Sequence, residues 1–375
     1  MLSKLSRSLV ACNIYVSAGG HPSHRDVLVG LLSETQELCR IANQSEKNNC
    51  PKSTDRGVVV VHAFRDGPYD RSSFHLAGSP DLVADVGSSL ATRAVRALLQ
   101  YDPMKDSDET IEKSIDSNPR RLYKTDSIGK RHPTVGLVDH VSVLPLVSNK
   151  SSINEDDLNI ADIASSVART IGENLESSGA RVLYYGHAHP SGKDLAAVRR
   201  DETPFFNNDK LITVEANDSA NTNVSTNRIH KPAGQATVGA PFRFVENYNI
   251  RLRPNVPKEV ARTLTKSIRE RGGQGLPFVE ALTLVYGRDQ YEIACNLLDP
   301  LVTPARKVEE RMKEWECNQI QKHKEYASGL VQTTYRVGTT NDMCLESLQE
   351  LFIEGGERAH NRQVLERLVN DFLHD

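Results

Sequence analysis

Three short segments contain the residue types that acid–base chemistry and anion binding require. In the first, residues 131–139 (RHPTVGLVD), His132 precedes Pro133 at the start of a run with strand composition. A histidine held by a stiff loop at a strand end suits proton transfer, because imidazole titrates near neutral pH. Residue type alone favours an ordinary surface-loop histidine, since the chain has 12 of them. A catalytic role for His132 therefore needs support from other residues.

The second segment, residues 64–71 (FRDGPYDR), combines carboxylates with arginine. Asp66 and Asp70 are suitable for orienting a histidine, and Arg71 for binding a carboxylate through two parallel hydrogen bonds. Asp, Gly and Pro together are also typical of a β-turn. Taken alone, the segment is more typical of such a turn than of a site.

The third segment, residues 238–250 (VGAPFRFVENYNI), has a glycine followed by polar residues at even spacing. Gly239 would let a ligand approach the backbone closely. Arg243, Asn247 and Asn249 would share one face of a single strand. One cation and two amides suit a ligand with carboxylates and ring amides. A half-solvated edge strand explains the pattern equally well.

His187 and His189 form a fourth candidate, because two histidines two residues apart in a strand point to the same side. Such a pair can ligate zinc in a metal-dependent hydrolase. No HExxH motif, cysteine pair or third ligand lies nearby. We therefore expect no metal and keep the hydrolase as the least favoured alternative.

Composition limits the classes of function. A length of 375 residues predicts two globular units, and the net charge of -3 gives no case for nucleic acid or membrane as a partner. No apolar stretch reaches the ~18 residues of a membrane span. The six cysteines are scattered, which favours reduced thiols in the cytoplasm. Residues 1–10 resemble a mitochondrial presequence only weakly.

The elements that must position these residues repeat one order, β-α-β-β-α-β. In the first half, we expect strands and helices at residues 9–16, 23–42, 58–64, 72–77, 80–98 and 135–146. A helix at 156–177, a strand at 182–185 and a helix at 194–200 follow. The second half repeats the order at residues 244–252, 257–271, 278–285, 290–298, 304–322 and 330–335.

This order is that of the ferredoxin-like, or split βαβ, motif. The sequence thus predicts an α+β fold of two ferredoxin-like subdomains in tandem. We place them at residues 1–236 and 237–340, followed by a helical tail at 341–375. Residues 103–131 and 205–236 lack apolar periodicity and read as insertions in the first subdomain.

Taken together, the segments resemble the formiminotransferase domain family, including the plant glutamate formiminotransferase-like proteins. "HPTVGLVDHVSVLPL" is similar to the family's His-Pro-x-x-Gly-x-x-Asp segment, and "LYYGHAHPSGKDLAAVRR" to its Leu-Tyr-Gly stretch. "VGAPFRFVENYNIRL" is similar to its folate-contacting strand, and "RERGGQGLPFVEALTLVYGRDQYEIACNLLDP" to the start of its second subdomain. The likeness covers most of residues 9–340, apart from the two insertions.

The resemblance implies an enzyme of one-carbon metabolism and histidine degradation, with a substrate tunnel between two subdomains and a homodimer as a usual assembly. It would transfer a formimino group from N-formiminoglutamate to tetrahydrofolate, the co-substrate. By motif match, His132 is the acid–base residue, and Asp66 holds its tautomer. The folate and substrate contacts implied are Gly239, Ala240, Arg243, Asn247, Tyr248, Asn249, Arg71 and Arg199.

Two departures from the family pattern keep an alternative open. Many members have His-Pro-Arg where this chain has Thr134, and Pro241 and Phe242 lengthen the binding strand by about one residue relative to the plant proteins. Losing that guanidinium removes a potential carboxylate anchor. The alternative is a folate-binding protein without transferase activity.

Overall fold

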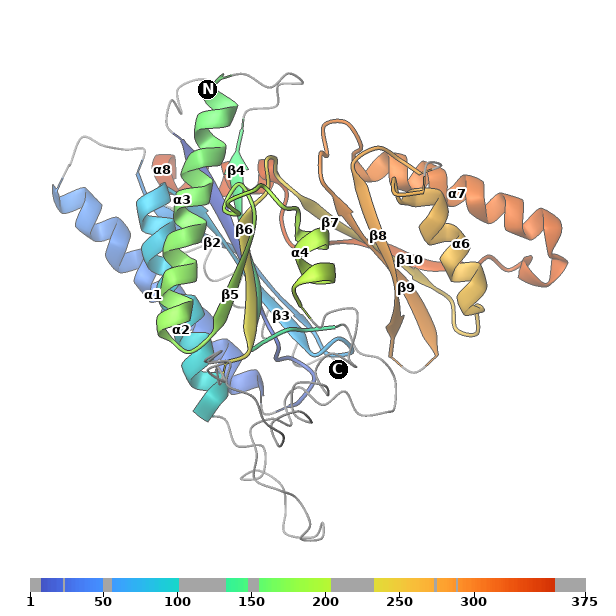
Figure 1. Cartoon of the computed structure of the whole chain (residues 1–375), viewed down its shortest axis with the longest axis horizontal. Coiled ribbons are helices and arrows are strands. Elements are labelled where there is room, and N and C mark those ends of the chain that lie inside the picture. The colour runs from blue at the N-terminus through green and yellow to red at the C-terminus, as the bar shows by residue number, and fades with distance from the viewer. Residues whose placement is uncertain are drawn as a thin grey trace, which may run out of the picture.

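The computed structural model describes residues 8–22, 24–49, 56–100, 133–147, 155–203, 233–272, 275–287 and 289–354. They form a mixed α/β structure with two β-sheets, each backed by helices (Figure 1). Among these residues, no helix has both the length and the apolar character of a membrane span.

The first sheet has six strands in the order β2-β3-β1-β4-β6-β5. The neighbours among β1 to β4 are antiparallel, whereas β6 runs parallel to both β4 and β5. The strands are β1 (Leu9–Val16), β2 (Val58–Asp66), β3 (Arg71–Gly78), β4 (Val138–Leu146), β5 (Arg181–Gly186) and β6 (Gln235–Ala240).

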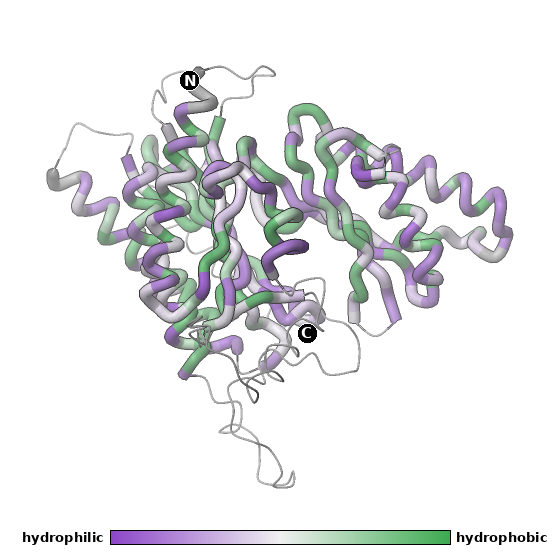
Figure 2. Tube along the Cα trace, in the orientation of Figure 1, coloured by the Kyte–Doolittle hydropathy of each residue, from purple (hydrophilic) through white to green (hydrophobic). Residues whose placement is uncertain are grey.

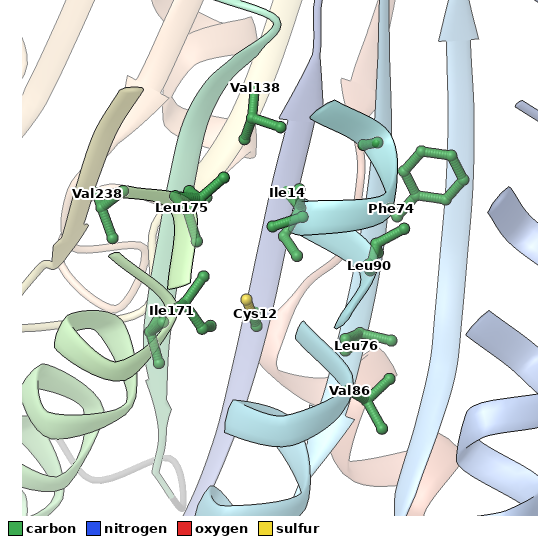
Figure 3. Packing of buried hydrophobic residues seen from close by; sticks show 14 of the residues in the cluster. Cys12, Ile14, Phe74, Leu76, Val86, Leu90, Val138, Ile171, Leu175 and Val238 are labelled. Carbon is green, nitrogen blue, oxygen red and sulfur yellow. The ribbon is translucent and has the colours of Figure 1, made fainter. Parts of the chain in front are cut away.

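Three long helices cover one face of this sheet: α1 (His24–Asn49), α2 (Pro80–Gln100) and α3 (Glu155–Ser177). Pro80 starts α2, where a missing N–H costs nothing, and the apolar stripe of this helix is buried. Cys12 and Ile14 of β1 point into the same core as Leu90 and Ile171 (Figure 3). The core between this face of the sheet and the helices is therefore built of apolar side chains.

The opposite face of the first sheet changes character along its strands. Leu9 and Ala11 of β1 and Leu144 of β4 pack under α8 (Asn341–Glu354). Further along the same face come Asn13 on β1 and His140 on β4, both buried. Helix α8 follows the second sheet in the chain but lies against the first (Figure 1). It covers the apolar half and leaves the polar half facing the second sheet.

The second sheet has four antiparallel strands in the order β10-β7-β9-β8. Its strands are β7 (Glu246–Leu252), β8 (Val279–Tyr286), β9 (Gln290–Leu297) and β10 (Val331–Val337). One face packs against α6 (Lys258–Ile268) and α7 (Ala305–Lys322), around Ile250 and Trp315. Figure 2 shows α7 as largely hydrophilic, as expected of a helix with one narrow buried stripe. Two short helices, α4 (Leu195–Asp201) and η3 (Lys324–Tyr326), complete the structure.

The observed elements follow the expected order twice, with three differences. First, residues 235–240 form β6 of the first sheet, so the chain crosses between sheets after Ala240 and not after residue 236. Second, α1 continues to Asn49 through a polar stretch where we expected a break. Third, residues 341–354 of the expected tail pack on the first sheet as α8.

Candidate functional site

A cavity of about 1430 Å³ lies between the polar face of the first sheet and the inner face of the second. Its floor comes from β1, β3, β4 and β5, and its opposite wall from β7, β8 and β9. A cavity of this size accommodates a ligand of cofactor dimensions. Its polar side chains are therefore the first candidates for a site.

Two arginines in the floor share one buried carboxylate. Arg71 Nη2 lies 2.9 Å from Asp139 Oδ2, and Arg199 Nη2 lies 3.2 Å from the same oxygen. Asp139 has no exposed surface, and Arg199 has 8%. Two guanidiniums around one carboxylate leave a net positive charge at the floor, which favours an anionic ligand group.

The local structure holds this triad in place. Asp139 is the second residue of strand β4, and its Oδ1 accepts a hydrogen bond from the backbone N–H of Val135 at 2.8 Å. Arg199 comes from α4, whose first turn is capped by the Asp194 side chain. Burial lowers the pKa of Arg199, and the Asp139 carboxylate opposes that effect.

Beside the triad, three rings lie across the floor. His140 lies between Tyr15, with ring centroids 5.5 Å apart, and Tyr185, at 5.4 Å in a stacked arrangement. Arg71 places its guanidinium 4.5 Å from the Tyr15 ring centroid. Burial, and then the positive charges of Arg199 and Arg71, lower the pKa of His140 well below its usual value. The imidazole is therefore neutral at neutral pH.

On the facing wall, Glu292 of β9 is completely buried and accepts four hydrogen bonds. Asn249 and Tyr69 donate to its Oε1, at 2.8 and 2.9 Å. Tyr335 and Arg251 donate to its Oε2, at 2.6 and 3.1 Å. Because Tyr69 belongs to the turn after β2, this carboxylate joins the two sheets at one edge of the cavity.

Asp66 lies at the end of β2 on the cavity wall and is only 7% exposed. Its Oδ1 accepts the backbone N–H of Tyr69 at 3.0 Å. Burial raises its pKa to about 6, and the nearby Glu292 carboxylate adds to the rise. Asp66 therefore gains or loses a proton near neutral pH, as a group in proton transfer would.

Six of the residues predicted for the site line this one cavity, although they come from distant parts of the chain. They are Asp66, Arg71, Arg199, Arg243, Asn247 and Asn249. Arg243 does not share a strand face with the two asparagines as we expected, because it lies in the connection between β6 and β7. There its Nε is 3.0 Å from Asp299 Oδ2.

Three other predicted residues lie elsewhere and correct our expectation. Tyr248 faces the helices of the second unit, where its hydroxyl donates to Glu309 at 2.6 Å. Ala240 is buried in the core of the first unit. Gly239 is not in the lining, and a Cβ there would meet Tyr185 at 2.4 Å. Strand alternation sends Tyr248 away from its neighbours Asn247 and Asn249.

The predicted acid–base residue, His132, lies outside the described residues; the described part of its motif begins at Pro133. His187 and His189 line the cavity. The ring of His187 stacks on Phe242 at 5.3 Å, and His189 Nδ1 accepts the backbone N–H of Ser191 at 3.0 Å. No group of three metal-ligating side chains occurs within the described ranges.

Sequence reasoning missed Asp139 and the three rings of the floor. His140 and Ser142 did carry a signal, because they alternate with Val141 and Val143 in a strand rich in apolar residues. Tyr15 and Tyr185 carried none, because aromatic residues are common in buried strands.

Comparison with known proteins finds two similarities. Residues 127–241 match the model of the formiminotransferase domain, N-terminal subdomain. A formiminotransferase cyclodeaminase-like protein of Arabidopsis thaliana is 29% identical over 252 residues, which is 65% of this chain and 73% of that protein. The resemblance to formiminotransferases is confirmed. The matched region includes Asp139 and Arg199, so it contributes to the cavity floor.

Comparison with solved structures gives only remote likenesses. The periplasmic protease PqqL of Escherichia coli is 10% identical, with a TM-score of 0.18, over 96% of this chain and 40% of that one. Pitrilysin is 11% identical, with a TM-score of 0.22, over 96% and 38% of the two chains. At these values the likenesses carry no argument about the fold or function of this chain.

Proposed function

We propose that this chain transfers a formimino group from N-formiminoglutamate to tetrahydrofolate in the cavity between its sheets. The observation that carries the proposal is the Arg71–Asp139–Arg199 triad, buried in the cavity floor, where Asp139 and Arg199 belong to the region that matches the formiminotransferase domain. Both substrates carry glutamate carboxylates, and arginine is the residue best suited to bind them. The cavity also has room for a folate.

The proposal includes two ferredoxin-like subdomains. It is supported by the strand orders β2-β3-β1-β4 and β10-β7-β9-β8, which are the same permutation of two β-α-β-β-α-β units. The first unit carries β5, β6 and α4 in addition. In this arrangement the two sheets present their faces to each other, and the substrates bind between them.

The reaction needs proton transfer at two nitrogens. The folate N5 amine attacks the amidine carbon, and the tetrahedral intermediate then collapses to release glutamate. The amine loses a proton and the leaving nitrogen gains one. A histidine can serve such steps, and general acid–base catalysis of this kind typically increases the rate ~10²–10⁴-fold. By motif match we assign this role to His132, oriented by Asp66.

The facing wall would hold the folate. Asn247 and Asn249 line the cavity on β7, and their amides suit the ring nitrogens and carbonyl of a pterin. Asn247 accepts a hydrogen bond from Tyr15 at 3.1 Å, which fixes its position across the cavity. Arg243 also lines the cavity, where its guanidinium would meet a carboxylate.

The test is turnover of N-formiminoglutamate with tetrahydrofolate, followed optically after acid converts the product to a methenyl folate. We expect turnover in the wild-type protein and its loss in His132→Ala. The matched control is His323→Ala, which removes an exposed histidine after α7 and should leave turnover unchanged. Turnover that survives in His132→Ala would refute the assigned role.

Thr134, where many family members have arginine, favours the second candidate, a folate-binding protein without transferase activity. Calorimetry distinguishes the two. Folate binding without turnover, with any formimino or formyl donor, would support the second candidate and make Thr134→Arg the next variant. Absence of folate binding would refute both.

A further inference from the structure

We propose that His140 is a further proton-transfer residue of this site, acting through Nε2 on the nitrogens of the bound substrates. The inference deepens the proposed function and rests on it. His140 lines the cavity floor from the centre of the first sheet and is 8% exposed. It belongs to the described part of the chain, eight positions after His132 in the sequence.

The pairing of four strands defines its surroundings. His140 is the register partner of Tyr15 on β1 and of Thr237 on β6. One row further along the sheet, Ser142 pairs with Asn13 on β1 and with Gly239 on β6. Because Gly239 has no side chain, the Tyr185 ring leans over β6 and reaches Ser142 and the edge of the imidazole.

The hydrogen bonds determine which ring nitrogen carries the proton. Thr237 donates its single hydroxyl proton to the Asp139 carbonyl at 3.1 Å and accepts Arg199 Nη2 at 3.2 Å. Its oxygen therefore acts as an acceptor for His140 Nδ1, 3.1 Å away. We infer that the proton is on Nδ1 and the lone pair on Nε2.

The lone pair on Nε2 remains available to a ligand. Tyr185, 3.4 Å from Nε2, gives its hydroxyl proton to Ser142 at 3.0 Å. Burial and the two neighbouring guanidiniums keep the imidazole neutral, as a proton acceptor must be. The groups whose protonation or charge acts on this ring are Tyr15, Arg71, Asp139, Tyr185 and Arg199.

A second observation points to a ligand in the same place. Asn13 Oδ1 is buried and has no hydrogen-bond partner among the described residues, although Asn13 is only 3% exposed. It also lines the cavity, beside Ser142. Buried carbonyl oxygens rarely remain without a donor. An N–H group of a ligand, such as a protonated nitrogen of the substrates, would satisfy it.

The proposed step is balanced without a further reagent. N-formiminoglutamate reacts as its formamidinium cation. The N5 lone pair forms the new bond to the amidine carbon, and the C=N electron pair moves to its nitrogen, which becomes a neutral amine. His140 Nε2 takes the N5 proton and becomes an imidazolium, whose charge the nearby Asp139 carboxylate favours. On collapse, the lone pair of that amine re-forms the C=N bond, the bond to the glutamate nitrogen breaks, and the imidazolium gives its proton to the glutamate nitrogen. His140 thus shares with His132 the two transfers that we assign to His132.

The test compares His140→Asn with the wild-type protein. Asparagine keeps an N–H that can donate to Thr237 but has no group at the position of Nε2. We expect kcat for formimino transfer to fall about 100-fold or more, with KM within about threefold. The acid limb of the wild-type pH–kcat profile, with a midpoint below the usual imidazole value, should disappear. His62→Asn, in the same sheet but outside the cavity lining, should keep both kcat and the acid limb.

The outcomes separate the two proposals. A wild-type protein without turnover refutes the proposed function and this inference with it. Wild-type turnover with unchanged kcat and pH profile in His140→Asn refutes this inference alone. Nitrogen-15 NMR of the wild-type imidazole tests it independently of any variant's folding. Nδ1–H with unprotonated Nε2 at pH 7 supports it, and an imidazolium or the Nε2–H tautomer overturns it.

Discussion

The ring of Tyr185 lies over the backbone of Gly239, where a Cβ would stand 2.4 Å from Tyr185 Cδ1. The two residues are register partners on β5 and β6. The Tyr185 side chain passes over Gly239 on β6, and its hydroxyl donates a hydrogen bond to Ser142 on β4, at 3.0 Å. Gly239 therefore shapes the cavity floor by making room for a tyrosine, and the close approach that we predicted for a ligand is made by this side chain.

Gly239→Ala should consequently displace both the Tyr185 ring and its backbone oxygen, which also lies 2.4 Å from the position of the Cβ, and break the hydrogen bond to Ser142. Overpacking of this kind costs about 1–3 kcal/mol, and urea unfolding measures the loss. Gly30→Ala is the contrast, because a Cβ at Gly30 in α1 meets nothing within 4 Å. That change should stabilise the protein by ~0.5–1 kcal/mol through helix propensity. Equal stability of Gly239→Ala and the wild type would show that the Tyr185 ring and the β5 backbone both shift at little cost.

The element order was predictable because hydrophobic periodicity gives it locally. The strand β6 was missed, because its residues 235–240 follow a polar stretch and include Gly239, a poor strand former. We also treated residues 238–250 as one binding strand. Pro241 interrupts it, since proline has no N–H for a sheet, and the chain crosses to the second sheet there.

Part of the site was also predictable from the local sequence. Asp66 and Arg71 were identifiable by residue type next to a turn. The triad was not, because Asp139 and Arg199 are 60 positions apart, and only the pairing of β4 with β6 and the position of α4 bring them together. We placed Tyr248 wrongly because we applied strand alternation to Asn247 and Asn249 but not to Tyr248 between them.

The hydrogen bond that Tyr69 donates to Glu292 should couple the two sheets. Tyr69→Phe and Tyr335→Phe each remove one hydroxyl from this buried carboxylate, at a cost of roughly 1.5–3 kcal/mol. Tyr335 belongs to the second sheet itself, whereas Tyr69 belongs to the first unit. Only Tyr69→Phe should lower hydrogen-exchange protection along the contact between the units. Identical exchange patterns in the two variants would contradict this role.

Asp66 should make stability depend on pH. Its pKa rises from the ordinary 3.8 to about 6 in the folded protein because it is buried. Between these values the folded state holds a proton that the unfolded state has lost, so stability falls as pH rises from about 4 to 6 and stays low above. The rise corresponds to roughly 3 kcal/mol.

Asp66→Asn keeps an oxygen for the Tyr69 N–H and cannot ionise. We expect the variant to match the wild type near pH 4 and to be more stable by up to about 3 kcal/mol at pH 8. Urea unfolding at the two pH values measures the difference. A variant that is less stable than the wild type at pH 8 would mean that the carboxylate is stabilised as an anion.

Arg71→Lys should weaken binding of the glutamate part of the substrate. Lysine keeps the positive charge near Asp139 but loses the planar fork that binds a carboxylate through two hydrogen bonds. A charge-assisted hydrogen bond is worth ~1.5–3 kcal/mol, so we expect KM for N-formiminoglutamate to rise about 10- to 100-fold, with kcat changing less. Arg93→Lys, in a surface pair with Glu34 on the helical face, is the matched control and should leave both constants unchanged. A fall in kcat with constant KM would instead mean that Arg71 acts on the transition state.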